Sequence, residues 1–172
     1  LPNMVWPGTK KRSFPEKISL LVMDFDGVMT DDRVWVDADG KEMVAANRSD
    51  GLGLERLRKL TDIQAMVISK ETNRVVEARC KKLGIPLIQS AEDKRNALES
   101  ILSQRDISTE EVVYLGNDLN DLPCFPMVGW AAVPASALPE MKHKADFVLQ
   151  KNGGFGAVRE LCDILIKRFS KV

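Results

Sequence analysis

Apolar and polar residues alternate along the chain in blocks that are typical of strands followed by helices. Residues 18–25 form a continuous apolar run that ends in acid, as expected of a parallel strand buried on both faces. The pattern predicts further strands at 65–69, 86–89, 112–116, 131–133 and 147–149. It predicts helices at 49–60, 72–83, 92–104, 119–128 and 156–169. This order indicates an α/β fold of the Rossmann-like kind, with a mostly parallel sheet and helices on both faces.

One segment departs from this alternation. Residues 33–47 form two short apolar stretches around Asp39-Gly40, a dipeptide typical of a two-residue hairpin turn because both positions take positive φ. An isolated two-stranded ribbon is marginal in water, so we expect this hairpin to be buried in a contact between subunits. The candidate interface residues are Val34, Trp35, Val36, Met43 and Val44.

Residues 1–16 hold three prolines, one glycine and the basic run Lys10-Lys11-Arg12. This composition predicts a linker, with the folded domain at 17–172, and suggests that the chain was cut from a larger protein. The basic run is either part of a nuclear signal or a solvated charge of the linker.

Composition excludes some functions. The chain of 172 residues has 25 Lys and Arg against 25 Asp and Glu, so it lacks the basic footprint of a nucleic-acid-binding protein. No apolar run approaches the ~18 residues that a membrane span needs. Cys80, Cys124 and Cys162 are widely spaced and predict reduced, buried thiols of an intracellular protein, with a reactive Cys124 as the alternative.

Two carboxylates follow the first predicted strand. Gly27 allows the chain to turn, so that Asp24 and Asp26 face one pocket. Carboxylates this close repel each other unless a cation or a proton lies between them, and Mg²⁺ suits such oxygen ligands. One carboxylate can then attack phosphorus and form an aspartyl-phosphate, while the other transfers a proton. The alternative is that these residues only cap a turn.

The segment DFDGVMTDD, residues 24–32, resembles the first motif, DxDGxxT/S, of the haloacid dehalogenase (HAD) phosphatases. The family's other motifs follow in order at Ser69, at Lys94 and at residues 116–121. The resemblance covers residues 18–169 and implies a HAD-like fold with a β-hairpin in place of a cap domain.

The resemblance also implies a role for each motif residue. Asp24 is expected to be the nucleophile and a metal ligand, and Asp26 the general acid/base, with its main-chain carbonyl on the metal. Ser69 and Lys94 are expected to bind and neutralise the phosphoryl group. The implied Mg²⁺ ligands are Asp24, Asp26, Asn117, Asp118 and Asp121.

Two motifs depart from the family pattern. The fourth motif usually reads Gly-Asp-x-x-x-Asp, but its first acid is replaced here by the uncharged Asn117, and Asp118 and Asp121 are only three residues apart. The second motif continues as Lys70-Glu71 instead of Gly-Arg, and Phe155 stands where many relatives carry arginine. These departures predict weak Mg²⁺ binding and reduced or absent turnover.

Residues 47–53 (NRSDGLG) and 153–160 (GGFGAVRE) resemble the HAD branch that hydrolyses 8-phospho-KDO and forms tetramers in which the hairpins pack together. The chain is also similar to the C-terminal domains of vertebrate sialic-acid-activating cytidylyltransferases. That similarity implies a catalytically weak or silent module for regulation and homotetramer assembly through 33–47, attached to an N-terminal cytidylyltransferase domain in the nucleus. The alternative is an active Mg²⁺-dependent phosphatase on a nine-carbon sugar-acid 9-phosphate.

Overall fold

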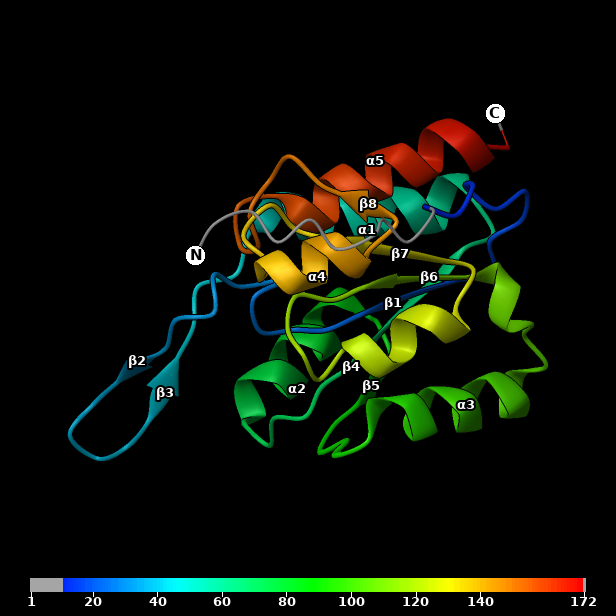
Figure 1. Ribbon diagram of the computed structural model, residues 1–172. Helices are drawn as coiled ribbons and strands as arrows, with labels where there is room; N and C mark the ends of the chain where they lie inside the picture. Colours follow the sequence, from blue (N-terminus) through cyan, green and yellow to red (C-terminus); the bar gives the residue numbers. More distant parts are fainter. Residues whose placement is uncertain (1–10, 172) are drawn as a thin grey trace.

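The computed structural model describes residues 11–171, which are built around a six-stranded parallel sheet (Figure 1). The strands lie in the order β5-β4-β1-β6-β7-β8, so the strand that precedes the two aspartates is central. Their bounds are β1 (Leu20–Met23), β4 (Gln64–Ile68), β5 (Leu87–Ile88), β6 (Val112–Leu115), β7 (Trp130–Val133) and β8 (Phe147–Val148). The predicted parallel sheet is confirmed.

Helices cover both faces of the sheet, as the alternating pattern predicted (Figure 1). One face carries α1 (Arg48–Leu60), α2 (Arg74–Leu83) and α5 (Ala157–Phe169). The other carries α3 (Lys94–Arg105), α4 (Pro139–Lys144) and the 3₁₀ helix η2 (Leu122–Met127). A second 3₁₀ helix, η1 (Thr109–Glu111), leads into β6. The predicted helix at 119–128 is thus a shorter 3₁₀ segment, since Pro123 and Pro126 remove backbone donors.

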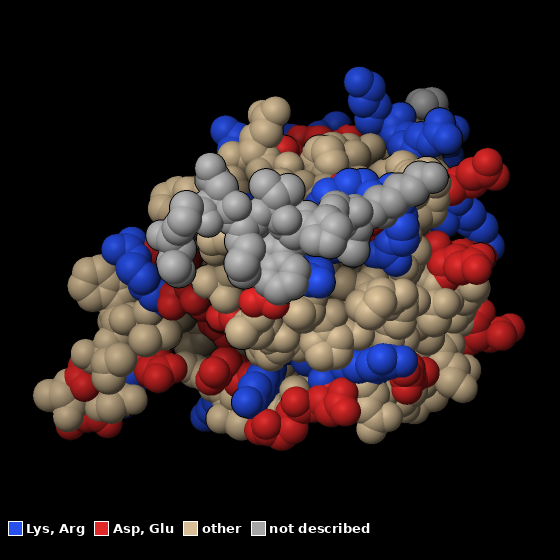
Figure 2. All heavy atoms as spheres, viewed as in Figure 1, with Lys and Arg blue, Asp and Glu red and all other residues tan. Residues whose placement is uncertain are grey.

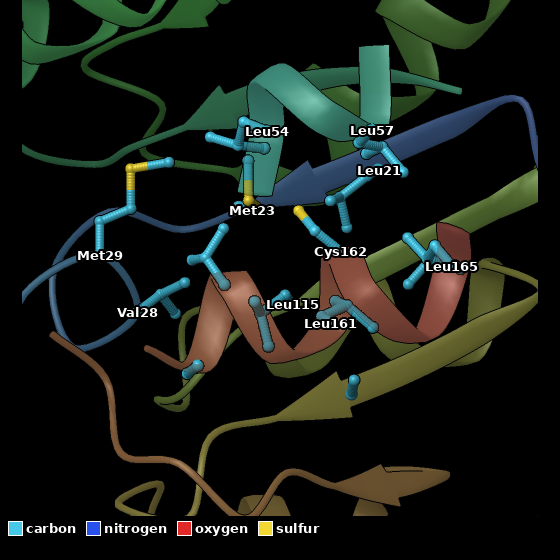
Figure 3. Packing of buried hydrophobic residues seen from close by; sticks show 14 of the residues in the cluster. Leu21, Met23, Val28, Met29, Leu54, Leu57, Leu115, Leu161, Cys162 and Leu165 are labelled. Carbon is cyan, nitrogen blue, oxygen red and sulfur yellow. The ribbon is translucent and has the colours of Figure 1, made fainter. Parts of the chain in front are cut away.

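The two faces of β1 supply two separate hydrophobic cores, because side chains of a strand alternate between its faces. Leu21 and Met23 pack toward α1 and α5 (Figure 3). Leu20 and Val22 pack toward α3 on the other face. The crossing of α1 and α5 is close at Gly53, where an added Cβ would lie 3.1 Å from the Arg159 Cα. This glycine weakens the predicted helix but permits tight packing of the two helices.

The hairpin projects away from the sheet and consists of β2 (Trp35–Val36) and β3 (Glu42–Met43) (Figure 1). Its turn is longer than the predicted two-residue turn at Asp39-Gly40. That turn needs positive φ at both residues, but of the two only Gly40 has it, at 78°. The Asp37 carboxylate accepts hydrogen bonds from the backbone N–H groups of Asp39 and Lys41, both at 2.9 Å. This side chain stabilises a wider turn and makes the predicted two-residue turn wrong.

Residues 11–16 contact the domain rather than extending away from it. Arg12 forms an ion pair with Asp146 at 2.7 Å and also donates to the Val128 and Phe125 carbonyls. The Phe14 ring lies 4.6 Å from the Trp130 ring, edge to face. The described part of the predicted linker therefore packs on the edge of the sheet, and residues 1–10 lie outside the described residues.

Across the part of the chain that the structure describes, no helix is both long and apolar enough to pass through a bilayer.

Candidate active site

The predicted catalytic residues lie at the carboxyl ends of neighbouring strands. Asp24 follows β1, Ser69 follows β4 and Asn117 lies two residues beyond β6. Parallel strands end at the same edge of a sheet, which is where α/β folds place their sites. A pocket of about 170 Å³ opens there. It is lined by Asp24, Asp26, Asp32, Ser69, Lys70, Glu71, Asn117, Asp118 and Asn120.

A tight turn shapes the first motif. Gly27 has a φ of 75°, and the Thr30 hydroxyl accepts hydrogen bonds from the N–H groups of Gly27 and Asp32, both at 3.2 Å. A Cβ on Gly27 would lie 1.9 Å from Nδ2 of Asn117. Glycine is therefore required at this position both for its backbone conformation and for the close approach of the fourth motif.

The glycine-rich segment before α5 supports this turn from behind. An added Cβ on Gly153 would lie 1.9 Å from the Gly27 carbonyl, and Gly154 donates to the Val28 carbonyl at 3.2 Å. Asn47 in turn donates to the Gly154 carbonyl at 3.2 Å. The segment therefore holds the catalytic turn in place, whereas the neighbouring Phe155 is 60% exposed and does not line the pocket.

Lys94 lies beneath the pocket and joins two carboxylates. Its side chain is 1% exposed, and Nζ lies 2.9 Å from Asp24 Oδ1 and 2.8 Å from Asp121 Oδ1. Burial alone would lower the pKa of Lys94, but the two carboxylates outweigh burial and raise it above its usual value. Lys94 therefore stays protonated and holds the nucleophile from within the protein.

Asp24 is fixed through one of its two oxygens. Among the described residues, both donors to its carboxylate, Lys94 Nζ and the Phe25 N–H at 2.7 Å, reach Oδ1. This arrangement leaves Oδ2 as the oxygen that can attack phosphorus. Burial raises the pKa of Asp24 well above its usual range and Asp121 raises it further, while Lys94 opposes both. The ionised nucleophile is therefore costly without another cation beside it.

Asp121, a predicted metal ligand, does not line the pocket with the others. It is fully buried, and its Oδ1 accepts from Lys94 and from the Tyr114 hydroxyl at 2.8 Å. Its Oδ2 accepts from the backbone N–H of Asn117 at 3.0 Å and of Asp118 at 3.4 Å. In this structure Asp121 orients Lys94 and the fourth-motif backbone.

The residues present fit a hard divalent cation. Asn117 Oδ1 is buried without a hydrogen-bond partner, which usually costs about 1–3 kcal/mol unless a ligand satisfies it. Within residues 11–171, no group of three or more His, Cys, Asp or Glu side chains is arranged as a metal cluster. The set that fits Mg²⁺ is instead the Asp24 carboxylate, the Asn117 amide oxygen and the Asp26 carbonyl, with Asp118 nearby on the pocket wall.

Asp26 has the properties of a proton donor. Its burial raises its pKa to about 6, and the carboxylates of Glu71 and Asp32 contribute to the shift. A carboxyl group with a pKa near neutrality can hold a proton for the leaving group and return to the ionised form afterwards.

Tyr114 shapes the site, although no motif of the sequence assigned it a role. Tyr114 interrupts an apolar strand with one hydroxyl, which was the available signal for its bond to Asp121. Asp32 has a φ of 70°, unusual for a residue with a side chain, and lines the pocket. The predicted buried thiols are confirmed. The alternative of a reactive Cys124 is not supported, because burial raises the pKa of its thiol to about 12.

A parallel sheet with a hairpin instead of a cap, and a nucleophilic aspartate beside a buried lysine, define a hydrolase of the HAD type. A family model of haloacid dehalogenase-like hydrolases matches residues 54–161. The chain therefore belongs to the haloacid dehalogenase-like hydrolases.

Within this class, the relatives define a narrower branch. The 3-deoxy-D-manno-octulosonate 8-phosphate phosphatase KdsC of Escherichia coli K12 is 39% identical over 152 residues, covering 88% of this chain and 80% of that protein. The same enzyme of Yersinia pestis is 37% identical over 150 residues, covering 87% of this chain and 80% of that protein. The chain belongs to this KdsC branch of the family.

Solved structures agree with this placement. The phosphatase of Moraxella catarrhalis, in complex with magnesium ion, phosphate ion and KDO, has a TM-score of 0.84 and 32% identity, covering 88% of this chain and 87% of that one. The cobalt-bound form of the Haemophilus influenzae enzyme also has a TM-score of 0.84 and 32% identity, covering 89% of this chain and 90% of that one. Close relatives thus bind divalent cations.

These relatives correct the functional interpretation of the sequence. The expectation of a silent assembly module of a sialic-acid-activating cytidylyltransferase is wrong, because the chain matches sugar-phosphate phosphatases over four-fifths of their length. The departures at Asn117 and Glu71 led to that expectation. Yet Asp24, Ser69 and Lys94 keep the arrangement that the phosphatase motifs predict.

Replacing Lys94 with methionine is expected to destabilise the fold. The substitution leaves the Asp24 and Asp121 carboxylates buried without their cation, at a cost of about 3–5 kcal/mol. Because the native state of the variant would hold protons that the unfolded chain releases, its stability should fall as pH rises from 5 to 8. Urea unfolding at both pH values measures this. Lys70→Met, at an exposed lysine, is the control, and unchanged stability of Lys94→Met at pH 8 would contradict the prediction.

Replacing Asn117 with aspartate is expected to tighten Mg²⁺ binding about tenfold, since ligand charge strongly sets affinity for hard cations. Isothermal titration of the wild type and the variant with MgCl₂ measures the change. Asn96→Asp, which adds the same charge in the exposed first turn of α3, should leave Mg²⁺ affinity unchanged. Equal affinities of wild type and Asn117→Asp would show that residue 117 is not a metal ligand.

Proposed function

We propose that this chain is a Mg²⁺-dependent phosphatase that hydrolyses the terminal phosphate ester of a long-chain sugar acid. The observation that carries the proposal is the shared pocket of Asp24, Asp26, Ser69 and Asn117, with Lys94 held against the nucleophile from below. The substrate class follows the relatives, which act on the 8-phosphate of an eight-carbon sugar acid. A nine-carbon sugar-acid 9-phosphate belongs to the same class.

The first half of the reaction uses both aspartates. Asp24 Oδ2 attacks phosphorus, the bond from phosphorus to the sugar oxygen breaks, and Asp26 gives its proton to that oxygen. The product is an aspartyl-phosphate and the free sugar alcohol. The Ser69 hydroxyl, which accepts from the Glu71 N–H at 3.1 Å, donates to a phosphoryl oxygen in this step.

The second half restores the protein. Asp26 takes a proton from a water molecule, which attacks the phosphorus and releases inorganic phosphate from Asp24. Lys94 stabilises the carboxylate that leaves in this step. A bound Mg²⁺ would offset the negative charge that Asp24 and the phosphoryl oxygens bring together.

Hydrolysis of p-nitrophenyl phosphate tests this function. We expect turnover by the wild type in Mg²⁺ that is abolished by EDTA and by Asp24→Asn, which removes the nucleophile. Asp26→Asn should lower kcat by about 10²–10⁴-fold, the usual contribution of a general base, because it removes the group that activates water; p-nitrophenolate itself leaves without a proton.

The control is Asp106→Asn, an exposed residue at the C-terminal end of α3 whose left-handed conformation suits asparagine equally well. It should retain full activity. No turnover by the wild type, or equal turnover by Asp24→Asn, would reject a phosphatase.

We also propose that the hairpin 33–47 joins subunits of a homotetramer. Its apolar residues Val34, Trp35, Val36 and Met43 are 49–69% exposed, an unfavourable state for an isolated ribbon of two-residue strands. The fifth candidate, Val44, instead packs against the core of its own subunit. Residence in the nucleus stays a prediction from the family resemblance.

Sedimentation of the wild type at micromolar concentration should give a tetramer. Trp35→Glu with Met43→Glu places two charges on the exposed hairpin and should shift the protein to smaller species. Leu138→Glu, at an exposed residue before α4, is the matched control and should remain tetrameric. A wild-type monomer would reject the assembly proposal.

A further inference from the structure

A second cavity of about 210 Å³ adjoins the catalytic pocket between the base of the hairpin and the start of α2. The two cavities share Asp26, Asp32 and Glu71. Under the proposed function, Asp26 must lie beside the oxygen of the leaving group. Ser69 and Asn117 occupy the first cavity, so the leaving group projects into the second.

The second cavity is built by a contact between distant parts of the chain. Glu42 of β3 accepts a hydrogen bond from Asn73 Nδ2 at 2.5 Å. Asn73 also begins α2 by accepting from the Val75 N–H at 3.0 Å, and its carbonyl accepts from Gln89 at 2.7 Å. This chain of bonds fixes the hairpin against the body and keeps the cavity open.

The charged side chains that line this second cavity are all acidic. Its titratable residues are Asp26, Asp32, Glu42 and Glu71, and none of the described residues that line it is Lys or Arg. Figure 2 shows acidic side chains gathered where the hairpin leaves the body. Carboxylates in a concave site create a negative potential that acts on any charged group entering it.

We propose that Glu71 and Glu42 select the leaving group by its charge next to the phosphoester. Hydroxyl or ammonium groups on the first few carbons would donate hydrogen bonds to these carboxylates, whereas a carboxylate or a second phosphate there would be repelled. A sugar acid phosphorylated at its terminal carbon meets this condition, because its hydroxylated end enters the cavity and its own carboxylate lies at the far end. The inference rests on the proposed function for the orientation of the ligand.

Three small esters that differ mainly in charge test the selection: phosphoethanolamine, 2-hydroxyethyl phosphate and phosphoglycolate. Their affinities are measured by isothermal titration with Mg²⁺ on Asp24→Asn, which binds without turnover, and as kcat/KM on the wild type. We expect phosphoethanolamine to be preferred over phosphoglycolate by about tenfold, given partly solvated charges. The hydroxyl ester should fall between them.

Variants that neutralise carboxylates test whether Glu42 and Glu71 cause this charge preference. Glu42→Gln with Glu71→Gln should reduce the preference to within about threefold, since two of the four carboxylates become neutral. Glu77→Gln removes the same charge from the exposed side of α2 and should leave the preference unchanged. Equal binding of the three esters to Asp24→Asn, no binding of any, or a preference that survives in the double variant overturns the inference.

The two proposals fail separately. Charge selection in the titrations without turnover of p-nitrophenyl phosphate would reject the phosphatase and retain the acidic subsite. Turnover of p-nitrophenyl phosphate with no charge selection among the three esters would do the reverse.

Discussion

The buried ammonium group of Lys94 is the contact on which the site depends. It lies within 3 Å of carboxylates from two motifs, Asp24 after β1 and Asp121 after β6, and it begins α3 at the residue after the Asp93 cap. Without this cation the two acids would be buried in mutual repulsion. One charge thus ties together two strands and a helix, and gives the nucleophile its orientation.

Close backbone approach is the second requirement, and glycines provide it. Gly27 leaves space for the Asn117 side chain, and Gly153 leaves space for the Gly27 carbonyl. Each contact stacks one loop on the next, so the catalytic turn is supported over its whole length by the segment that leads into α5. The hairpin has less support, since its two-residue strands pair only with each other, Glu42 bonds the body through Asn73, and most of its apolar side chains face solvent. The catalytic turn is therefore packed more tightly than the hairpin.

The sequence predicted the sheet, the helices and the pocket because these follow from local rules. A buried run ending in acid, repeated at neighbouring strands, places Asp24, Ser69 and Asn117 at one edge. The role of Asp121 could not be predicted in this way, since it depends on which of its oxygens face Lys94 and Tyr114. The contact of Glu42 with Asn73, 31 residues apart, has no sequence signal either. The functional interpretation was wrong because it gave each departure from the family motifs, such as Asn117 and Glu71, its own weight against activity. It gave too little weight to Asp24, Ser69 and Lys94, which together keep the arrangement of a phosphatase site.

The amide at position 117 changes the balance of charge in the pocket. The lining already contains the carboxylates of Asp24, Asp26, Asp32, Glu71 and Asp118 against the single exposed cation of Lys70. A further carboxylate at 117 would attract a cation more strongly, but it would also add repulsion whenever the cation is absent. The neutral amide keeps the empty pocket stable and leaves an oxygen directed to the same place. A phosphoryl group entering the pocket brings the negative charge that the fourth motif lacks, so we expect the metal and the phosphate ester to strengthen each other's binding.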